Sequence, residues 1–164
     1  MLVGNFLNYK DRTTLRVVLP VTFEKLLGLF EEKTEILTAC DSHDFKCVYL
    51  NCSFYQEEYS GLDLETANEI AKAFIKAEKS HTDRELAAYF EKNDFESINS
   101  IGDCKFYDSK ESFINKLYEK YGLTDIKFLW TTVDNFLDDE AVFEEFCLAG
   151  NSYRAANGIV VEIE

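Results

Sequence analysis

The sequence predicts an α+β protein built as a chain of three small modules. Residues 1–61 combine short runs of β-branched and aromatic residues with one helical pattern, which is typical of a small α+β module. Residues 62–96 contain no Gly or Pro and repeat apolar residues with a helical period, which predicts a central helical module at 62–103. A strand, two helices and a terminal hairpin are predicted from residue 104, so residues 104–164 form a second α+β module.

In the N-terminal module, two short strands are predicted at residues 2–8 and 15–19, separated by a polar turn at 10–13. Pro20 ends the second strand, and Thr22 is a suitable N-cap for a helix. The apolar face of this helix consists of Phe23, Leu26, Leu27 and Phe30. Two further strands are expected at residues 35–40 and 46–54, and the module ends near Gly61.

The central module is predicted to contain two helices. The first has an apolar stripe made of Leu64, Ala67, Ala71 and Phe74. The second begins with a capping box at residues 82–85 and continues into Leu86, Tyr89 and Phe90. His81 lies at the break between the two helices, and we interpret it as a loop residue.

The C-terminal module starts with a short strand at residues 104–107, followed by a helix at 109–121 that Gly122 ends. The core face of that helix is predicted to consist of Phe113, Ile114, Leu117, Tyr118 and Tyr121. A second helix lies within residues 133–148, and residues 152–164 form a hairpin that turns at 156–158. The last strand is either buried or paired across a subunit interface.

The charge of the chain indicates the class of partner. The 164 residues carry 31 acidic and 17 basic side chains, a formal net charge of -14, interleaved with 14 Phe and 9 Tyr. Such a charge opposes direct binding to nucleic acid or anionic membranes, so we expect a basic partner surface. No stretch has the length of a membrane span and the start lacks a secretory pattern, so we expect a cytoplasmic protein.

The cysteines predict neither disulfides nor a cofactor. Five Cys in a cytoplasmic chain are expected to be reduced thiols. One group needs weighing as a zinc site: Cys40, His43, Cys47 and Cys52 lie within 13 residues. Their spacing lacks the close Cys pair of structural zinc sites, so we interpret Cys47 and its neighbours as small core residues and expect no bound metal.

Acidic residues are densest in the C-terminal part, where residues 106–164 carry 12 acids and 5 bases. Six of the acids fall within 12 residues: Asp134, Asp138, Asp139, Glu140, Glu144 and Glu145. If this segment is one helix, Asp134, Asp138 and Glu145 project opposite its Phe residues. Glu140 and Glu144 then lie on a flank, and the acids form an exposed ridge. In the alternative, Asp138 caps a shorter helix and the next two acids favour its N-terminal dipole. Both interpretations can hold, since capping uses only one or two of the six acids.

Helical carboxylates can imitate nucleic-acid phosphates. Acids on adjacent turns are separated by roughly 6 Å along the helix axis, since each residue rises by about 1.5 Å. Duplex DNA carries about one charge per 1.7 Å of axis when both strands are counted. An acidic ridge is therefore able to compete for the basic groove of a DNA-binding protein.

The order of motifs resembles the ArdA family of antirestriction proteins. The likeness spans nearly the whole chain and rests on LRVVLPVTFEK at 15–25, LDDEAVFEEF at 137–146, LAGNSY at 148–153 and NGIVVEI at 157–163. The intervening LDL at 62–64, NEIA at 68–71 and FYDS at 106–109 follow the same order. The resemblance implies an elongated, non-catalytic homodimer, joined through its C-terminal module, that mimics bent DNA in the DNA-binding groove of Type I restriction–modification enzymes.

On this basis we expect a set of carboxylates to contact the partner and a smaller set of residues to form the dimer interface. The carboxylates are Asp63, Glu65, Glu69, Glu85, Glu111, Glu119, Asp134, Asp138, Asp139, Glu140, Glu144 and Glu145. The dimer residues are Leu148, Ala149, Tyr153, Ile159 and Val161.

The central helix departs from the pattern of the family because three lysines reduce its net negative charge: Lys72, Lys76 and Lys79. They either form pairs with acids such as Glu69 or mark another target. The alternative function is therefore a phage or mobile-element inhibitor of a different nucleic-acid-binding machine, such as a CRISPR nuclease. A small enzyme is the third hypothesis, but the sequence has no His paired with a nucleophile and no Gly-rich phosphate loop.

Overall fold

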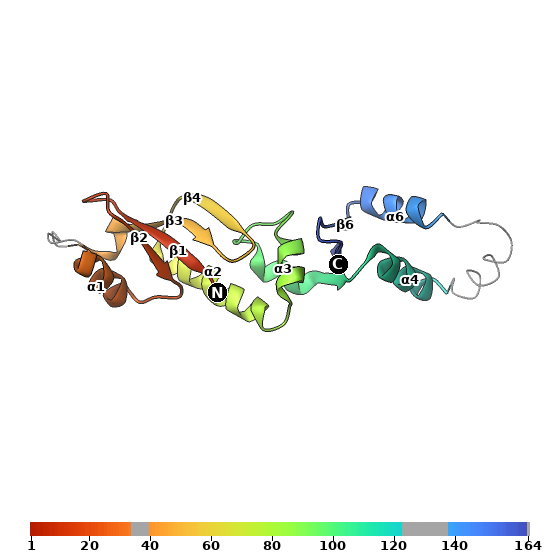
Figure 1. The fold of residues 1–164 in the computed structure, drawn as a ribbon, viewed down its shortest axis with the longest axis horizontal. Helices are drawn as coiled ribbons and strands as arrows, with labels where there is room; N and C mark the ends of the chain where they lie inside the picture. Colours follow the sequence, from red (N-terminus) through yellow and green to blue (C-terminus); the bar gives the residue numbers. More distant parts are fainter. Residues whose placement is uncertain (34–39, 123–137, 164) are drawn as a thin grey trace. The chain divides into compact units, whose positions relative to one another are not determined.

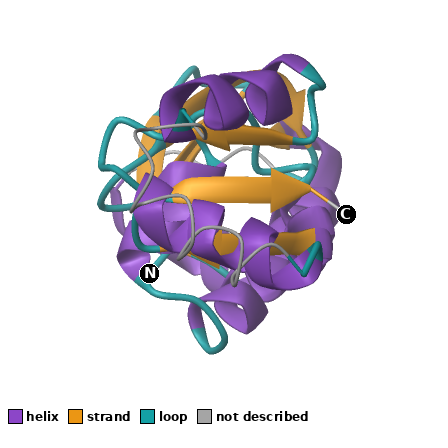
Figure 2. Cartoon of the chain, turned by 90° about the vertical axis from the view of Figure 1, so that its right-hand side faces the viewer, coloured by secondary structure: helices purple, strands orange, loops and turns teal. Residues whose placement is uncertain are grey.

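The computed structural model describes residues 1–33, 40–122 and 138–163 (Figure 1). The described residues form an α+β protein with two antiparallel sheets, one of four strands and one of three. Figure 2 distinguishes its helices and strands by colour. The chain divides into two compact units: a first unit of Met1–Asp83 with Asn93–Asn99, and a second unit of Arg84–Lys92 with Ser100–Glu164.

The predicted central helical module is grouped differently in the structure. Its first helix, α2 (Leu64–Glu78), belongs to the first unit, whereas α3 (Asp83–Tyr89) belongs to the second from Arg84 onward. Ala88 of α3 packs with Ala155, Ile159 and Val161 of the second unit, which accounts for the grouping of this helix.

The sheet of the first unit has the strand order β2-β1-β3-β4, and all neighbours are antiparallel. The strands are β1 (Val3–Asn8), β2 (Thr14–Val18), β3 (Phe45–Asn51) and β4 (Gln56–Leu62). The first three confirm the predicted strands, whereas the predicted strand at 35–40 lies almost entirely outside the described residues. Strand β4 was not predicted, because its sequence QEEYSGL is polar and suits a half-exposed edge strand.

The first helix of this unit begins directly after Thr22, as the sequence predicts. Helix α1 (Phe23–Lys33) follows the cis Leu19–Pro20 bond, and the hydroxyl of Thr22 accepts a hydrogen bond of 3.3 Å from the Lys25 amide. Its buried Phe30 ring lies 4.9 Å from the Phe45 ring of β3, which packs α1 on the sheet. The predicted stripe of α2 is likewise buried: Leu64, Ala67, Ala71 and Phe74.

A segment distant in sequence completes the core of the first unit. The Phe95 ring is fully buried, with its centroid 5.0 Å from that of Tyr55 and 6.0 Å from that of Phe74. Its backbone amide donates a hydrogen bond of 3.0 Å to the Glu57 carboxylate of β4. The chain therefore returns to the first unit after α3 and is held there by one buried ring and one charge-assisted hydrogen bond.

The sheet of the second unit has the order β5-β7-β6, formed by β5 (Cys104–Tyr107), β7 (Val160–Ile163) and β6 (Ser152–Arg154). Because side chains alternate along a strand, β7 contributes to two separate cores. Val160 packs with residues of α4 (Lys110–Lys120) and α6 (Asp139–Leu148), and Val161 packs with Ala88 of α3. The short 3-10 helices Ser42–Asp44 and Ile98–Asp103 precede β3 and β5.

The hairpin and the helices of the second unit confirm most of the sequence predictions. The chain turns between β6 and β7 with a hydrogen bond of 2.9 Å from the Gly158 amide to the Ala155 carbonyl, and Gly158 has a φ of 88°. Ser109, predicted as the first residue of this helix, is the N-cap of α4. Tyr121 was wrongly assigned to the core, because it lies in the C-cap of α4 with a side chain 57% exposed. None of the described helices is both long and apolar enough to cross a membrane.

The Phe95 contact generates the first prediction. Replacing Phe95 by Ala leaves a cavity between Tyr55 and Phe74, so we expect the free energy of unfolding to fall by about 3 kcal/mol in urea denaturation. Val18→Ala is the control, since Val18 lies in the same unit and is 52% exposed, and it should change stability by less than about 0.5 kcal/mol. Equal effects of the two substitutions would show that Phe95 does not support the core.

Candidate functional site

The candidate site is the set of carboxylates that the sequence predicts to face a basic partner. The structure places them in two groups, one in each unit. Three lie at the start of α2 in the first unit: Asp63, Glu65 and Glu69. Those of the second unit lie on α3, α4 and around α6: Glu85, Glu111, Glu119, Asp138, Asp139, Glu140, Glu144 and Glu145. Asp134 falls outside the described residues.

Asp63 has a structural task at the start of α2. Its carboxylate accepts a hydrogen bond of 2.8 Å from the backbone amide of Thr66, which caps the helix. That bond, together with the Thr66 hydroxyl and the charge of Lys46, lowers the pKa of Asp63. Glu65 and Glu69 follow on the exposed side of the helix. Two of the three acids are therefore available to a partner without loss of a cap.

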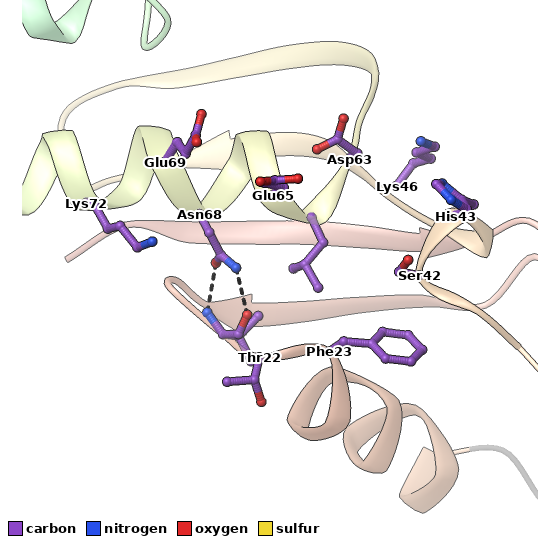
Figure 3. Close-up of a pocket in the computed structure, with 12 residues that line it drawn as sticks. Thr22, Phe23, Ser42, His43, Lys46, Asp63, Glu65, Asn68, Glu69 and Lys72 are labelled. Atoms are coloured by element: carbon purple, nitrogen blue, oxygen red, sulfur yellow. Dashed lines mark hydrogen bonds between the residues drawn. The ribbon is translucent and has the colours of Figure 1, made fainter.

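A pocket of about 430 Å³ adjoins these three acids (Figure 3). One wall is the start of α2, and the other consists of the segment around Thr22 and Phe23. Asn68 connects the walls: its side-chain carbonyl accepts a bond of 2.9 Å from the Val21 amide, and its NH₂ group donates one of 2.8 Å to the Val21 carbonyl. This double hydrogen bond holds the segment after Pro20 against α2.

The charges around this pocket are mixed. Asp63, Glu65 and Glu69 share its rim with His43, Lys46 and Lys72, as Figure 3 shows. Cations within the same rim offset part of the negative potential, since interactions between nearby charges are only partly screened. The pocket therefore presents a less acidic surface to a basic partner than the count of its carboxylates suggests.

Opposite charges also separate along the exposed side of α2. Glu65 and Glu69 occupy its first half, and Lys72, Lys76 and Lys79 follow at spacings of three and four residues. Within the described part of the chain, the three lysines form no ion pair, so the pairs predicted with Glu69 are absent there. Acids near the N-terminus and bases near the C-terminus both favour the helix dipole, which accounts for this order.

In the second unit, the structure shows the capping role of Asp138 in the acidic C-terminal segment. Helix α6 begins at Asp139, and the Asp138 carboxylate accepts hydrogen bonds from the amides of Glu140 and Ala141. Asp138 is thus the N-cap of a short helix, as in the second interpretation. Part of the predicted ridge is consequently used to start the helix.

Two further acids of α6 bind groups of α4. The Tyr118 hydroxyl donates a hydrogen bond of 2.7 Å to Asp139, and burial together with this carboxylate raises the pKa of Tyr118 to about 12. Lys110 pairs with Glu140. These contacts connect the first turn of α6 to α4, next to the shared core of Phe113 and Phe143.

Glu144 and Glu145 are the acids of the ridge that are not used in contacts within the described fold. Both side chains are exposed, and neither forms a hydrogen bond or ion pair with the residues that the structure describes. The sequence has no Lys or Arg between Lys127 and Arg154, so no basic neighbour in sequence offsets them. They belong to the second half of α6, where the C-terminal end of the helix dipole adds to their negative potential.

The other predicted acids differ in how available they are. Glu111 is exposed on α4, Glu85 is half-buried on α3, and Glu119 pairs with Lys116 at 2.6 Å.

Glu58 of β4 is an exposed acid that the prediction missed, because the strand itself was missed. A hydrogen bond with Glu58 raises the pKa of Tyr49 on the neighbouring strand.

The residues predicted to form a dimer interface are only partly accessible. Ile159 and Val161 are buried in the core of the second unit, and the Tyr153 hydroxyl donates to the carbonyls of Ala88 and Tyr89. Strand β7 pairs with β5 on one edge and with β6 on the other, so the last strand is buried rather than open to a second subunit. Leu148, 83% exposed, and Ala149 remain available.

Two of the five cysteines, Cys47 and Cys52, are buried, as their interpretation as core residues predicts, whereas the other three are half-buried. Cys47 is fully buried on β3, and burial raises the pKa of its thiol to about 12. Cys52 is also buried, whereas Cys40 is half-buried and His43 exposed. Among the described residues, no three His, Cys, Asp or Glu side chains come together as metal ligands.

The sequence of the chain was compared with known protein families and with curated proteins. Neither the models of known protein families nor the curated proteins contain a match to the chain.

The Asp63 cap generates a prediction about pH. Because the folded-state pKa of Asp63 lies below its value of 3.8 in the unfolded chain, its stabilisation is present above that pH and is lost as the pH falls through the folded-state pKa. We expect Asp63→Ala to lower the free energy of unfolding by about 1 kcal/mol at neutral pH and by less near pH 3, measured by urea denaturation. Asp63→Asn is the control because Asn also caps helices. A penalty for Asp63→Ala that is independent of pH would contradict this role.

Proposed function

We propose that this protein is a non-catalytic antirestriction protein, an acidic DNA mimic that occupies the DNA-binding groove of Type I restriction–modification enzymes. The observation that carries the proposal is the open end of α6, where Glu144 and Glu145 are exposed and form no ion pair among the described residues. The order of sequence motifs that resembles the ArdA family supports the same function.

The physical basis is electrostatic. A carboxylate without a neighbouring cation keeps its full attraction for a basic groove, whereas a paired one must first release its partner. Attraction between surface charges is screened over about 8 Å at physiological salt. Affinity for the enzyme is therefore expected to fall steeply as salt is added, and duplex DNA is expected to compete.

The acids that serve this function differ from the full predicted set. Glu144 and Glu145 make the direct contacts, with Glu111 on α4 and Glu65 and Glu69 on α2 as further contacts. Asp63, Asp138 and Asp139 act indirectly: two cap helices, and the third binds Tyr118. The first group is free to move toward a partner, and the second holds the helices that carry it.

A homodimer is part of the proposal, and its interface is narrower than the sequence suggests. Leu148 and Ala149 at the end of α6 supply it, because Ile159 and Val161 already fill the core of their own unit. A large apolar side chain that is 83% exposed is a suitable anchor for such an interface.

One observation favours the alternative target, a different nucleic-acid-binding machine such as a CRISPR nuclease. The second half of the exposed side of α2 is basic, since Lys72, Lys76 and Lys79 form no ion pair within the described residues. A partner whose surface has acidic as well as basic parts would fit this helix better than a uniformly basic groove.

Charge reversal on α6 tests the function. We expect Glu144→Lys with Glu145→Lys to weaken binding to a Type I methyltransferase core by at least about tenfold, equal to about 1.4 kcal/mol, measured by calorimetry at low salt. The fold should be retained, because Lys is favourable near a helix C-terminus.

Glu31→Lys with Glu32→Lys is the matched control. These two acids are also adjacent, exposed and in the last turns of a helix, so the net charge changes by the same amount at another place. Unchanged binding of the α6 variant, or equal loss in both variants, would remove the α6 surface from the mechanism. Inhibition of a CRISPR nuclease without any effect on restriction would favour the alternative target.

The dimer has a separate test. We expect the protein to sediment as a dimer at tens of micromolar, a concentration well above usual specific dissociation constants, and Leu148→Asp to sediment as a monomer. Val18→Asp is the control, because Val18 is also an exposed apolar residue but lies on β2 of the first unit. A monomeric wild-type protein would refute the dimer and leave the electrostatic proposal standing.

A further inference from the structure

Strand β4 forms one edge of the sheet in the first unit. The sheet has the order β2-β1-β3-β4, so among the described residues β3 is the only strand that pairs with β4. An open edge of a sheet is a place where an extended segment of another protein can add a strand. The backbone groups and charges along β4 therefore decide which segment it accepts.

The hydrogen-bond pattern fixes which residues of β4 face the open edge. Residues of an antiparallel pair alternate between hydrogen-bonded and non-hydrogen-bonded positions. The Cys52 amide donates a hydrogen bond of 2.9 Å to the Tyr55 carbonyl, and the register beyond this pair is regular as far as Glu58. Gln56 and Glu58 consequently occupy non-hydrogen-bonded positions. Their backbone amides and carbonyls point away from β3, and they have no hydrogen-bond partner within the described part of the chain.

Four acidic side chains lie along this edge. Glu57 and Glu58 belong to β4 itself. Asp94 and Glu96 are both exposed, and they flank Phe95, whose amide lies 3.0 Å from the Glu57 carboxylate. Two acids of the strand are thus joined by two acids from a segment distant in sequence.

The negative charge of these acids is not offset by cations. Glu57 binds a backbone amide, Glu58 binds a tyrosine hydroxyl, and Asp94 accepts a hydrogen bond of 2.8 Å from a serine amide. These partners are neutral, and none of the four acids forms an ion pair with another described residue. Neither residues 47–71 nor residues 93–99 contain a Lys or Arg. The edge therefore presents an uncompensated negative potential to a partner.

The opposite edge of the sheet, β2, is different. The Thr14 carbonyl accepts a hydrogen bond of 2.6 Å from Lys33 of α1, and the exposed Arg16 adds a second cation. Lysine beside an edge strand is one of the ways in which proteins protect such an edge from other chains. Strand β4 has no such protection among the described residues.

We infer that β4 binds an extended basic segment of another protein, which joins the sheet as a further strand. The backbone of the segment pairs with the open groups of Gln56 and Glu58, and a Lys or Arg at every second position faces the side of Glu58. The acids favour a basic segment over a neutral or acidic one. This inference is independent of the proposed inhibitory function, because it uses none of the carboxylates assigned to that function.

A synthetic peptide tests the inference on the full-length protein. We expect calorimetry at physiological salt to detect binding of a short peptide that alternates lysine and valine. The matched control is the same peptide with N-methylated backbone amides, which has the same charge but cannot donate the hydrogen bonds of a strand. It should bind at least about tenfold more weakly, because the open carbonyls of β4 then stay unpaired.

Protein variants locate the binding surface. We expect Glu58→Lys with Glu96→Lys to weaken binding of the peptide at least about tenfold, because like charges then face each other. Glu57 stays unchanged in this variant, because its carboxylate holds a backbone amide. Glu144→Lys with Glu145→Lys is the control, since it changes the net charge equally but lies on α6. It should bind the peptide like the wild type, even where it loses a restriction enzyme.

Hydrogen exchange gives an independent readout of the position. In the free protein the amides of Gln56 and Glu58 should exchange quickly, whereas the Glu57 amide, which faces β3, is protected. Saturating peptide should slow the exchange of the first two amides. The inference would be overturned by a wild-type protein that does not bind, by equal binding of the N-methylated peptide, by equal weakening in both variants, or by protection confined to other elements.

Discussion

The first unit depends on the burial of Phe95, a residue that follows α3 in the sequence. Its ring lies against Tyr55 and Phe74, and its amide is bound by Glu57 on the edge strand β4. An aromatic ring of this size contributes several kcal/mol when it is fully buried. The unit is therefore assembled from two separate pieces of chain, Met1–Asp83 and Asn93–Asn99, and the segment between them belongs to the second unit.

Several acidic residues are likewise used within the fold. Glu57 is an acid whose carboxylate binds an internal backbone amide, and Asp63, Asp138 and Asp139 have comparable local tasks. A carboxylate that caps a helix or binds a buried amide stabilises the fold through charge-assisted hydrogen bonds. Fewer acids are then left for a partner than the net charge suggests, and the open ones on α6 are Glu144 and Glu145.

Most of the local structure was predictable from the sequence, because it depends on short-range physics. The caps at Thr22 and Ser109 and the buried stripe of α2 all follow from residue type and spacing. The predictions failed where neighbours distant in sequence decide. Strand β4 is polar and forms because it pairs with β3. Tyr121 has the right helical spacing, but it lies at the edge of the core, where its ring contacts Phe146 of α6 and its side chain stays 57% exposed.

The candidate site shows the same division. The sequence by itself determined the excess of acids, their concentration near the C-terminus and the two possible roles of Asp138, because composition and helix capping are local properties. Only the tertiary structure decided which carboxylates are used internally, that β7 is closed on both edges, and that β4 forms an edge of its sheet. Those features depend on contacts between elements far apart in the chain, and no local pattern of residues encodes them.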